Sequence, residues 1–197
     1  MIGVKFKKLR ISKKKSGFSL VELIVSLSVI TLLTGLFLAN YHNANRRTDL
    51  TMTAQALVTD IRYAQANALG LIKYDGAVPA GGWGVYFSAG GMGNSNNTSY
   101  VIFADENDDR LYQVGEGQEN LGGRLVDLPP NIVIDRIMVG SSQNARATVT
   151  FLPPDPLTRI RGSSGTSTFL EIRLRENLND TTKTVRVNFL GLVEVID

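Results

Sequence analysis

The sequence has no cysteine and a single histidine, His42, among its 197 residues. Without cysteine there is no disulfide framework, no thiolate metal ligand and no thiol nucleophile. Zinc sites take most of their ligands from cysteine and histidine, so most kinds of zinc site are excluded. A single histidine without a neighbouring acidic residue in the sequence is also a poor candidate for a catalytic base. We therefore expect a protein that is not an enzyme. His42 is better explained as a polar residue that follows the apolar, membrane-spanning run of residues 18–39.

Acidic residues are missing from the first 17 positions, which carry seven lysines and arginines. The remaining 180 residues hold 14 basic and 18 acidic side chains, so the pI of about 9.2 belongs to this leader. The high pI is therefore no argument for nucleic-acid binding by the rest of the chain.

Charge is also scarce in residues 18–39, where Glu22 is the one ionisable side chain. A helix of this length spans roughly 33 Å at 1.5 Å per residue, enough to cross a bilayer. Basic residues before the run outnumber Arg46 and Arg47 after it, which places the N-terminus in the cytoplasm and the C-terminal body outside. An acid inside a spanning helix costs about 2.5 to 3.5 kcal/mol near its centre, so Glu22 needs a neutralising partner.

A basic leader ends in Gly17, Phe18 follows, and Glu22 comes four residues later at the start of the apolar run (KKKSGFSLVEL, residues 13–23). This string resembles the class III signal of type IV prepilins and pseudopilins. The resemblance implies cleavage after Gly17 by a prepilin peptidase, N-methylation of Phe18, and use of the helix as the core of a filament. It also implies a partner for Glu22, the α-amino group of Phe18 in a neighbouring subunit. The alternative is a plain signal anchor in which Glu22 reaches water at the membrane surface.

No proline occurs between residues 18 and 78, and apolar residues recur beyond the membrane at steps of three and four. The pattern predicts one helix from residue 18 to about residue 70, although Gly35 or the polar residues 40–49 could bend it. In residues 40–72 the helix is expected to be amphipathic and to pack an apolar stripe on a sheet. That stripe consists of Leu50, Ala54, Leu57, Ile61, Ala64, Ala68 and Leu71.

After residue 72 the sequence changes to short β-branched and aromatic runs separated by turn residues, which predicts a β-rich globular head over residues 73–197. The fold class is therefore α+β, a long N-terminal helix packed on an antiparallel β-rich head. Exposed loops are expected at residues 75–82, 88–99 and 153–167. The predicted strands are residues 83–87, 100–104, 124–128, 132–139, 147–152, 168–175, 184–189 and 192–196.

Motifs in the body are similar to those of the GspH/FimT group of minor pilins and pseudopilins. They are a helix end around Asp60 and Arg62, a Gly-Trp-Gly-Val-Tyr-Phe strand, a strand that ends at Asp105, and a terminal turn at Gly191. The resemblance implies a minor subunit of a type IV pilus or a type II secretion pseudopilus. Its partners would be other pilin subunits, the prepilin peptidase and an inner-membrane assembly platform. It would be located first in the plasma membrane and then in a periplasmic or extracellular filament. The alternative is a signal-anchored extracellular domain that binds calcium or another ligand and does not polymerise.

An acidic segment follows the second predicted strand, with oxygen-bearing residues at the spacing of a twelve-residue calcium loop. Arg110 stands where such loops use glycine, and the flanking strands cannot make a helix-loop-helix hand. The alternative is a solvated acidic hairpin loop. The candidate ligands are Asp105, Asn107, Asp109, the carbonyl of Leu111, Gln113 and Glu116.

DNA capture is known for some FimT-like minor pilins, whose pattern for it is a C-terminal Gly-Arg-x-Arg turn. The matching place here reads Gly191-Leu192-Val193-Glu194 and has neither arginine. Residues 131–197 hold eight basic and seven acidic residues, so charge favours alternating solvated strand faces over a DNA-binding surface. We therefore do not expect nucleic acid as a partner. The basic residues that remain as candidates are Arg159, Arg161, Arg173, Arg175, Lys183 and Arg186.

Overall fold

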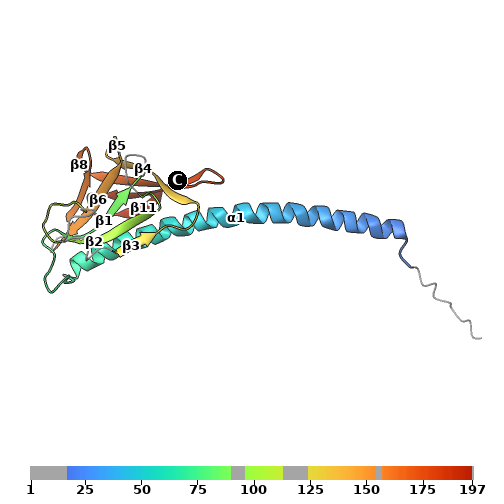
Figure 1. The fold of residues 1–197 in the computed structure, drawn as a ribbon, viewed down its shortest axis with the longest axis horizontal. Helices are drawn as coiled ribbons and strands as arrows, with labels where there is room; N and C mark the ends of the chain where they lie inside the picture. The colour runs from blue at the N-terminus through green and yellow to red at the C-terminus, as the bar shows by residue number, and fades with distance from the viewer. Residues whose placement is uncertain (1–16, 90–95, 113–123, 154–156, 197) are drawn as a thin grey trace, which may run out of the picture. The chain divides into compact units, whose positions relative to one another are not determined.

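A computed structural model describes residues 17–89, 96–112, 124–153 and 157–196, with only the backbone described for residues 39–45. The leader therefore lies outside the described residues up to position 16. The chain divides into two compact units, residues 1–42 and residues 43–197, which are described separately below (Figure 1).

The helix α1 is continuous from Leu20 to Leu69, which confirms the predicted helix and its end near residue 70. The backbone stays helical through Gly35 and the polar residues 40–49, the two places where the sequence allowed a bend. Within the first unit, Leu20–Leu38 is long and apolar enough to cross a membrane by length and composition.

The second unit contains α1 from residue 43 onward and two antiparallel sheets, so the α+β fold class is confirmed (Figure 1). One sheet has six strands in the order β3-β2-β1-β6-β7-β8, and the other has five in the order β11-β10-β9-β4-β5. The strands are β1 (Gly82–Ser88), β2 (Ser99–Asp105), β3 (Arg124–Asp127), β4 (Ile132–Val139), β5 (Ser142–Asn144), β6 (Arg146–Leu152), β7 (Leu157–Gly162), β8 (Gly165–Ser167), β9 (Phe169–Glu176), β10 (Thr181–Asn188) and β11 (Val193–Ile196).

One hydrophobic core joins α1 to both sheets. Leu57 and Ile61 of the helix are fully buried, and so are Phe87 of the six-stranded sheet and Ile172 of the five-stranded sheet. Small residues such as Ala64 on the helical stripe let the helix approach the strands closely. The predicted stripe is confirmed at six of its seven positions.

Two expectations were wrong. Leu71 lies past the end of α1 with a φ of 51° and is 51% exposed, so it belongs to a turn and not to the buried stripe. Residues 153–167 were expected to form an exposed loop, but they include β7, which pairs with β6 from Ala147↔Gly162 to Leu152↔Leu157, and β8. The prolines before β7 suggested a loop, whereas Ile160 is buried in the core and fixes the strand.

Candidate functional site

The start of α1 lies immediately after the predicted cleavage site. Gly17, Phe18 and Ser19 precede the helix, and Phe18 is 80% exposed. A Cβ atom placed on Gly17 would meet nothing within 4 Å, so the fold itself does not require glycine there.

Ser19 caps α1. Its Oγ accepts a hydrogen bond from the backbone N–H of Glu22 at 3.2 Å, and its carbonyl accepts the first helical hydrogen bond from Leu23 at 3.1 Å. The spacing Ser19-x-x-Glu22 is that of a capping box, in which serine and glutamate satisfy unpaired N–H groups at the helix start. This signal can be read in the sequence, and our sequence analysis missed it.

Glu22 lies in the first turn of α1 with an exposed side chain. An acid in this turn is stabilised by the partial positive charge of the helix N-terminus. Among the described residues no cation pairs with the Glu22 carboxylate. The predicted pairing with the Phe18 amine of a neighbouring subunit remains a prediction.

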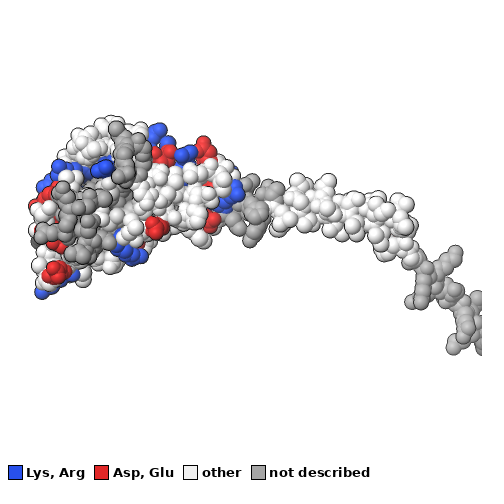
Figure 2. All heavy atoms as spheres, viewed as in Figure 1, with Lys and Arg blue, Asp and Glu red and all other residues white. Residues whose placement is uncertain are grey.

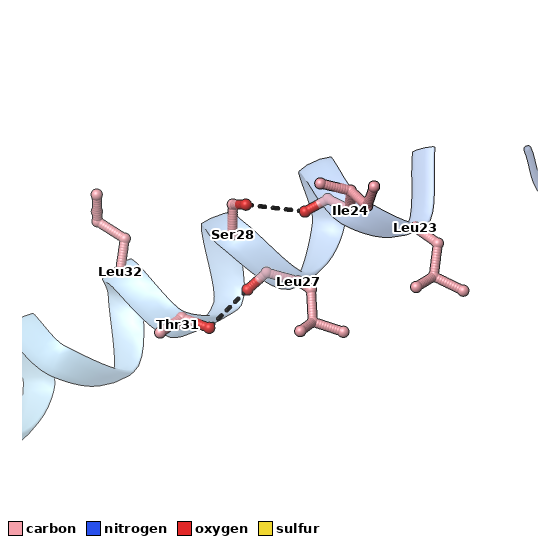
Figure 3. A pocket seen from close by; sticks show the side chains of 6 residues that line it. All are labelled: Leu23, Ile24, Leu27, Ser28, Thr31 and Leu32. Carbon is pink, nitrogen blue, oxygen red and sulfur yellow. Dashed lines mark hydrogen bonds between the residues drawn. The ribbon is translucent and has the colours of Figure 1, made fainter. Parts of the chain in front are cut away.

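The apolar part of α1 presents a shallow groove on the helix surface, shown in Figure 3. Leu23, Leu27 and Leu32 border it, while Ser28 and Thr31 donate their hydroxyl hydrogens to the carbonyls of Ile24 and Leu27. These internal hydrogen bonds satisfy the hydroxyl donors in an apolar environment. Small hydroxyl residues between leucines suit the close packing of a second apolar helix.

Asp105, the first candidate calcium ligand, is fully buried at the end of β2. Its Oδ2 accepts a hydrogen bond from the N–H of Arg110 at 3.0 Å, and its Oδ1 has no hydrogen-bond partner among the described residues. Burial raises the pKa of the Asp105 carboxyl, an effect that the hydrogen bond from Arg110 reduces. Gly81 lies against this carboxyl, because a Cβ at position 81 would come within 2.2 Å of it.

Three further candidate ligands lie in the described part of the loop. The side chain of Asn107 accepts the N–H of Asp109 at 3.0 Å, and that of Asp109 accepts the N–H of Leu111 at 2.8 Å. Arg110 has a φ of 64°, so it adopts the backbone conformation for which calcium loops use glycine. Gln113 and Glu116 lie outside the described residues. No group of three or more histidine, cysteine, aspartate or glutamate side chains that could hold a metal occurs among the residues that are described.

Two arginines of β7 hold this acidic loop against the six-stranded sheet. Arg159 pairs with Asp108 at 2.7 Å, and Arg161 donates to the carbonyl of Asp109 at 2.7 Å. Tyr112 extends the contact, with its ring centroid 5.2 Å from that of Tyr86 on β1. Sequence reasoning missed this arrangement because it placed both arginines in a loop.

Most of the candidate DNA-binding residues on the five-stranded sheet are engaged in ion pairs. Arg173 and Arg175 both pair with Asp135, and Arg186 pairs with Glu171 at 3.4 Å. Figure 2 shows basic and acidic side chains mixed over the visible face of the head. This distribution favours solvated, internally paired strand faces and gives no support to a basic DNA-binding surface.

One comparison with known proteins gives a match. Residues 12–38 match the model of the prokaryotic N-terminal methylation motif, which supports a type IV pilin-like chain that is processed by a prepilin peptidase. The matched segment contains Gly17, Phe18 and Glu22 and ends with the apolar part of α1. No curated protein and no solved structure matches the chain.

Proposed function

We propose that the chain is a minor subunit of a type IV pilus or a type II secretion pseudopilus, similar to the GspH/FimT group. The observation that carries this proposal is the methylation motif, which leads without interruption into an exposed apolar helix. In this role the protein is structural. The prepilin peptidase cleaves it after Gly17, Phe18 is N-methylated, and α1 leaves the membrane to pack among the helices of other subunits.

The helix supports this role in a second way. Its apolar side chains, such as Leu27 and Phe37, are 61% and 71% exposed and need an apolar environment, which either lipid or neighbouring helices provide. A subunit that changes from one to the other keeps its apolar surface covered at both stages. Before assembly it is anchored in the plasma membrane with its N-terminus in the cytoplasm, and afterwards it lies in a periplasmic or extracellular filament.

Mass spectrometry of the mature chain tests the proposal. We expect an N-methylated Phe18 terminus, and the same chain in the filament fraction that is sheared from cells. A chain that keeps residues 1–17 and stays entirely in the membrane would refute the proposal and favour the signal-anchored surface domain.

Calcium binding by the acidic loop is a second candidate function, supported by the buried Asp105 Oδ1, which no group in the described part of the chain hydrogen-bonds. A hard oxygen ligand of this kind suits calcium, and Asn107 and Asp109 lie in the same loop. Calorimetric titration of the full-length protein in detergent tests it. We expect saturable heat when calcium is added to the wild type and none for Asp105→Ala. Absence of heat from the wild type at millimolar calcium would contradict calcium binding and favour the solvated acidic loop.

A further inference from the structure

A pocket lies on the six-stranded sheet beside the acidic loop, and we call it the tyrosine–arginine pocket. It encloses about 350 Å³, a size within the usual range of small-molecule sites. Its lining comes from β1, β6, the end of β7 and the last described residues of the acidic loop. The residues that define it are Tyr86, Tyr112, Arg146, Thr148, Arg161 and Ser163.

The strand register brings these side chains together. Tyr86 of β1 lies opposite Thr148 of β6, and Thr148 lies opposite Arg161 of β7. Side chains alternate between the two faces of a strand, and both neighbours of Tyr86 in the sequence point away from this row. The row from Tyr86 to Arg161 therefore lies on one face of the sheet. Arg146 precedes Thr148 by two residues in β6, so it lies on the same face.

The tyrosine–arginine pocket is positively charged. No aspartate or glutamate occurs among the described residues that line it. Arg146 is exposed, and no acidic side chain in the described part of the chain pairs with it. Arg161 uses one N–H group for the carbonyl of Asp109, at 2.7 Å, and a guanidinium has further donors. The complementary ligand is an anion, and a carboxylate matches a guanidinium with two parallel hydrogen bonds.

Two tyrosine rings add an aromatic wall to the pocket. The ring centroids of Tyr86 and Tyr112 are 5.2 Å apart, and the Tyr112 ring also packs 5.5 Å from that of Phe103, which is fully buried. Because the two tyrosine rings already contact each other, they leave no gap in which a nucleobase could stack between them. The C–H groups of a sugar ring pack on an aromatic surface, whereas an isolated phosphate ion makes no use of it.

Hydroxyl groups complete the lining, since four of the six residues that define the pocket carry one. Burial raises the pKa of Tyr86, an effect that the Arg146 guanidinium reduces, so the Tyr86 hydroxyl stays protonated at neutral pH and can donate. The Ser163 hydroxyl donates to Oδ1 of Asn144 at 3.0 Å, so its oxygen can accept a hydrogen bond from a ligand. These groups suit a ligand that has several hydroxyls of its own.

We propose that the tyrosine–arginine pocket binds an acidic sugar of the uronic acid type. Its carboxylate pairs with Arg146 and Arg161, and a C–H face of its ring packs on Tyr86 and Tyr112. A uronic acid combines the three features that the lining calls for, namely a carboxylate, an apolar ring face and several hydroxyls. This binding function goes beyond filament assembly and does not depend on it. A nucleic acid fits less well, because its phosphate backbone is bound by cations spread along a surface and this pocket has two.

Calorimetric titration of the full-length protein in detergent tests the proposal, with calcium chelated so that the acidic loop does not contribute. The probes are D-galacturonate, its linear trimer, neutral D-galactose and inorganic phosphate. We expect saturable binding of galacturonate, and binding at least about tenfold weaker for galactose, which lacks the carboxylate, and for phosphate, which lacks the ring. Tighter binding of the trimer identifies a polysaccharide as the source of the sugar, and equal affinity identifies a single sugar.

Two variants locate the site. Arg146→Ala removes an exposed guanidinium and should weaken galacturonate binding at least about tenfold. The matched control is Arg136→Ala, at an exposed arginine of β4 in the other sheet, which should bind galacturonate like the wild type. In saturation-transfer NMR the ring C–H protons of galacturonate should receive the strongest signal from the protein. Tyr86→Phe keeps the aromatic ring and should preserve this transfer, whereas Tyr86→Ala should reduce it.

Several outcomes would overturn the inference. The wild type would bind neither galacturonate nor the trimer, or it would bind phosphate equally well, which would indicate a site for anions in general. Equal losses for Arg146→Ala and Arg136→Ala would place the binding elsewhere. A thymidine oligonucleotide that binds more tightly than the trimer, and loses affinity in Arg146→Ala, would replace the sugar by a nucleic acid. None of these outcomes bears on the proposed function, which the mature N-terminus and recovery in filaments decide.

Discussion

Replacement of Glu22 distinguishes two roles proposed for this side chain, a capping box with Ser19 and an ion pair with the Phe18 amine of a neighbouring subunit. In a single subunit the backbone N–H of Glu22 is capped by Ser19, and the carboxylate is exposed. In the proposed filament the carboxylate is buried beside the Phe18 amine of a neighbour. If capping dominates, Glu22→Gln should behave like the wild type, because glutamine also fits a capping box. If ion pairing dominates, it should resemble Glu22→Ala.

The two roles differ in magnitude as well. Loss of a helix cap costs about 1 kcal/mol, whereas a buried ion pair that loses one partner costs about 3 to 5 kcal/mol. The larger cost corresponds to a decrease of roughly 10² to 4 × 10³ in subunit affinity. We therefore expect Glu22→Ala and Glu22→Gln both to insert in the membrane and to be cleaved after Gly17, while little of either appears in filaments.

Quantitative immunoblotting of membrane and sheared filament fractions measures this effect. Ser19→Ala is the matched control, because it removes the cap and keeps the carboxylate, and it should assemble nearly normally. Recovery of Glu22→Gln in filaments at the wild-type level would refute the ion-pair reasoning, and equal losses for Ser19→Ala and Glu22→Ala would assign Glu22 to the cap.

Three further predictions follow from the processing site, the acidic loop and the core. Gly17→Val should block release of the leader, and normal cleavage at Phe18 seen by mass spectrometry would contradict the class III signal. Burial raises the pKa of Asp105, so the native state retains the carboxyl proton to a higher pH than the unfolded chain does. The stabilisation that this protonated carboxyl provides is lost as pH rises through the folded-state pKa. In melting experiments with calcium chelated, the stability of Asp105→Asn relative to the wild type should therefore increase from pH 4 to pH 8, and a constant difference would argue against a buried charge. In urea titrations, Leu57→Ala should lower the free energy of unfolding by about 2 to 5 kcal/mol, because it removes a fully buried side chain. Met52 is 64% exposed on the same helix, so Met52→Ala should change this free energy by less than about 0.5 kcal/mol.

The parts of the fold that the sequence predicted well depend on local patterns. The helix α1 follows from an apolar run, an apolar stripe at helical spacing beyond it, and the absence of proline between residues 18 and 78. The strand β9 and the second half of β10 follow from alternation of apolar and polar residues. The strand β7 was missed because two of its six residues are arginines and it follows a proline-rich segment. Its pairing with β6 and its burial depend on tertiary contacts, which local propensity does not contain.

The same distinction applies to the candidate sites. Gly17, Phe18 and Glu22 form one short string, so a motif reveals them. The contacts of the acidic loop are not local, because Arg159 and Asp108 are 51 residues apart in the chain. The groove that Asp49 and Met52 of α1 form with Arg124 and Asp127 of β3 likewise combines a helix with a strand that begins more than 50 residues after the helix ends. No local pattern could have identified either arrangement.

The capping geometry also explains why cleavage and assembly should be coupled. Release of the leader after Gly17 creates a charged amine on Phe18, one residue before the cap of α1. This amine lies at the positive end of the helix dipole, where a cation is unfavourable. Methylation of a primary amine leaves it basic, so the mature terminus keeps its charge and needs a carboxylate nearby. In the proposed filament, Glu22 of a neighbouring subunit supplies that carboxylate, and in the precursor, where the nitrogen of residue 18 belongs to an uncharged amide, the pair cannot form. On the proposed function, processing therefore creates the cation on which packing against a neighbouring Glu22 depends.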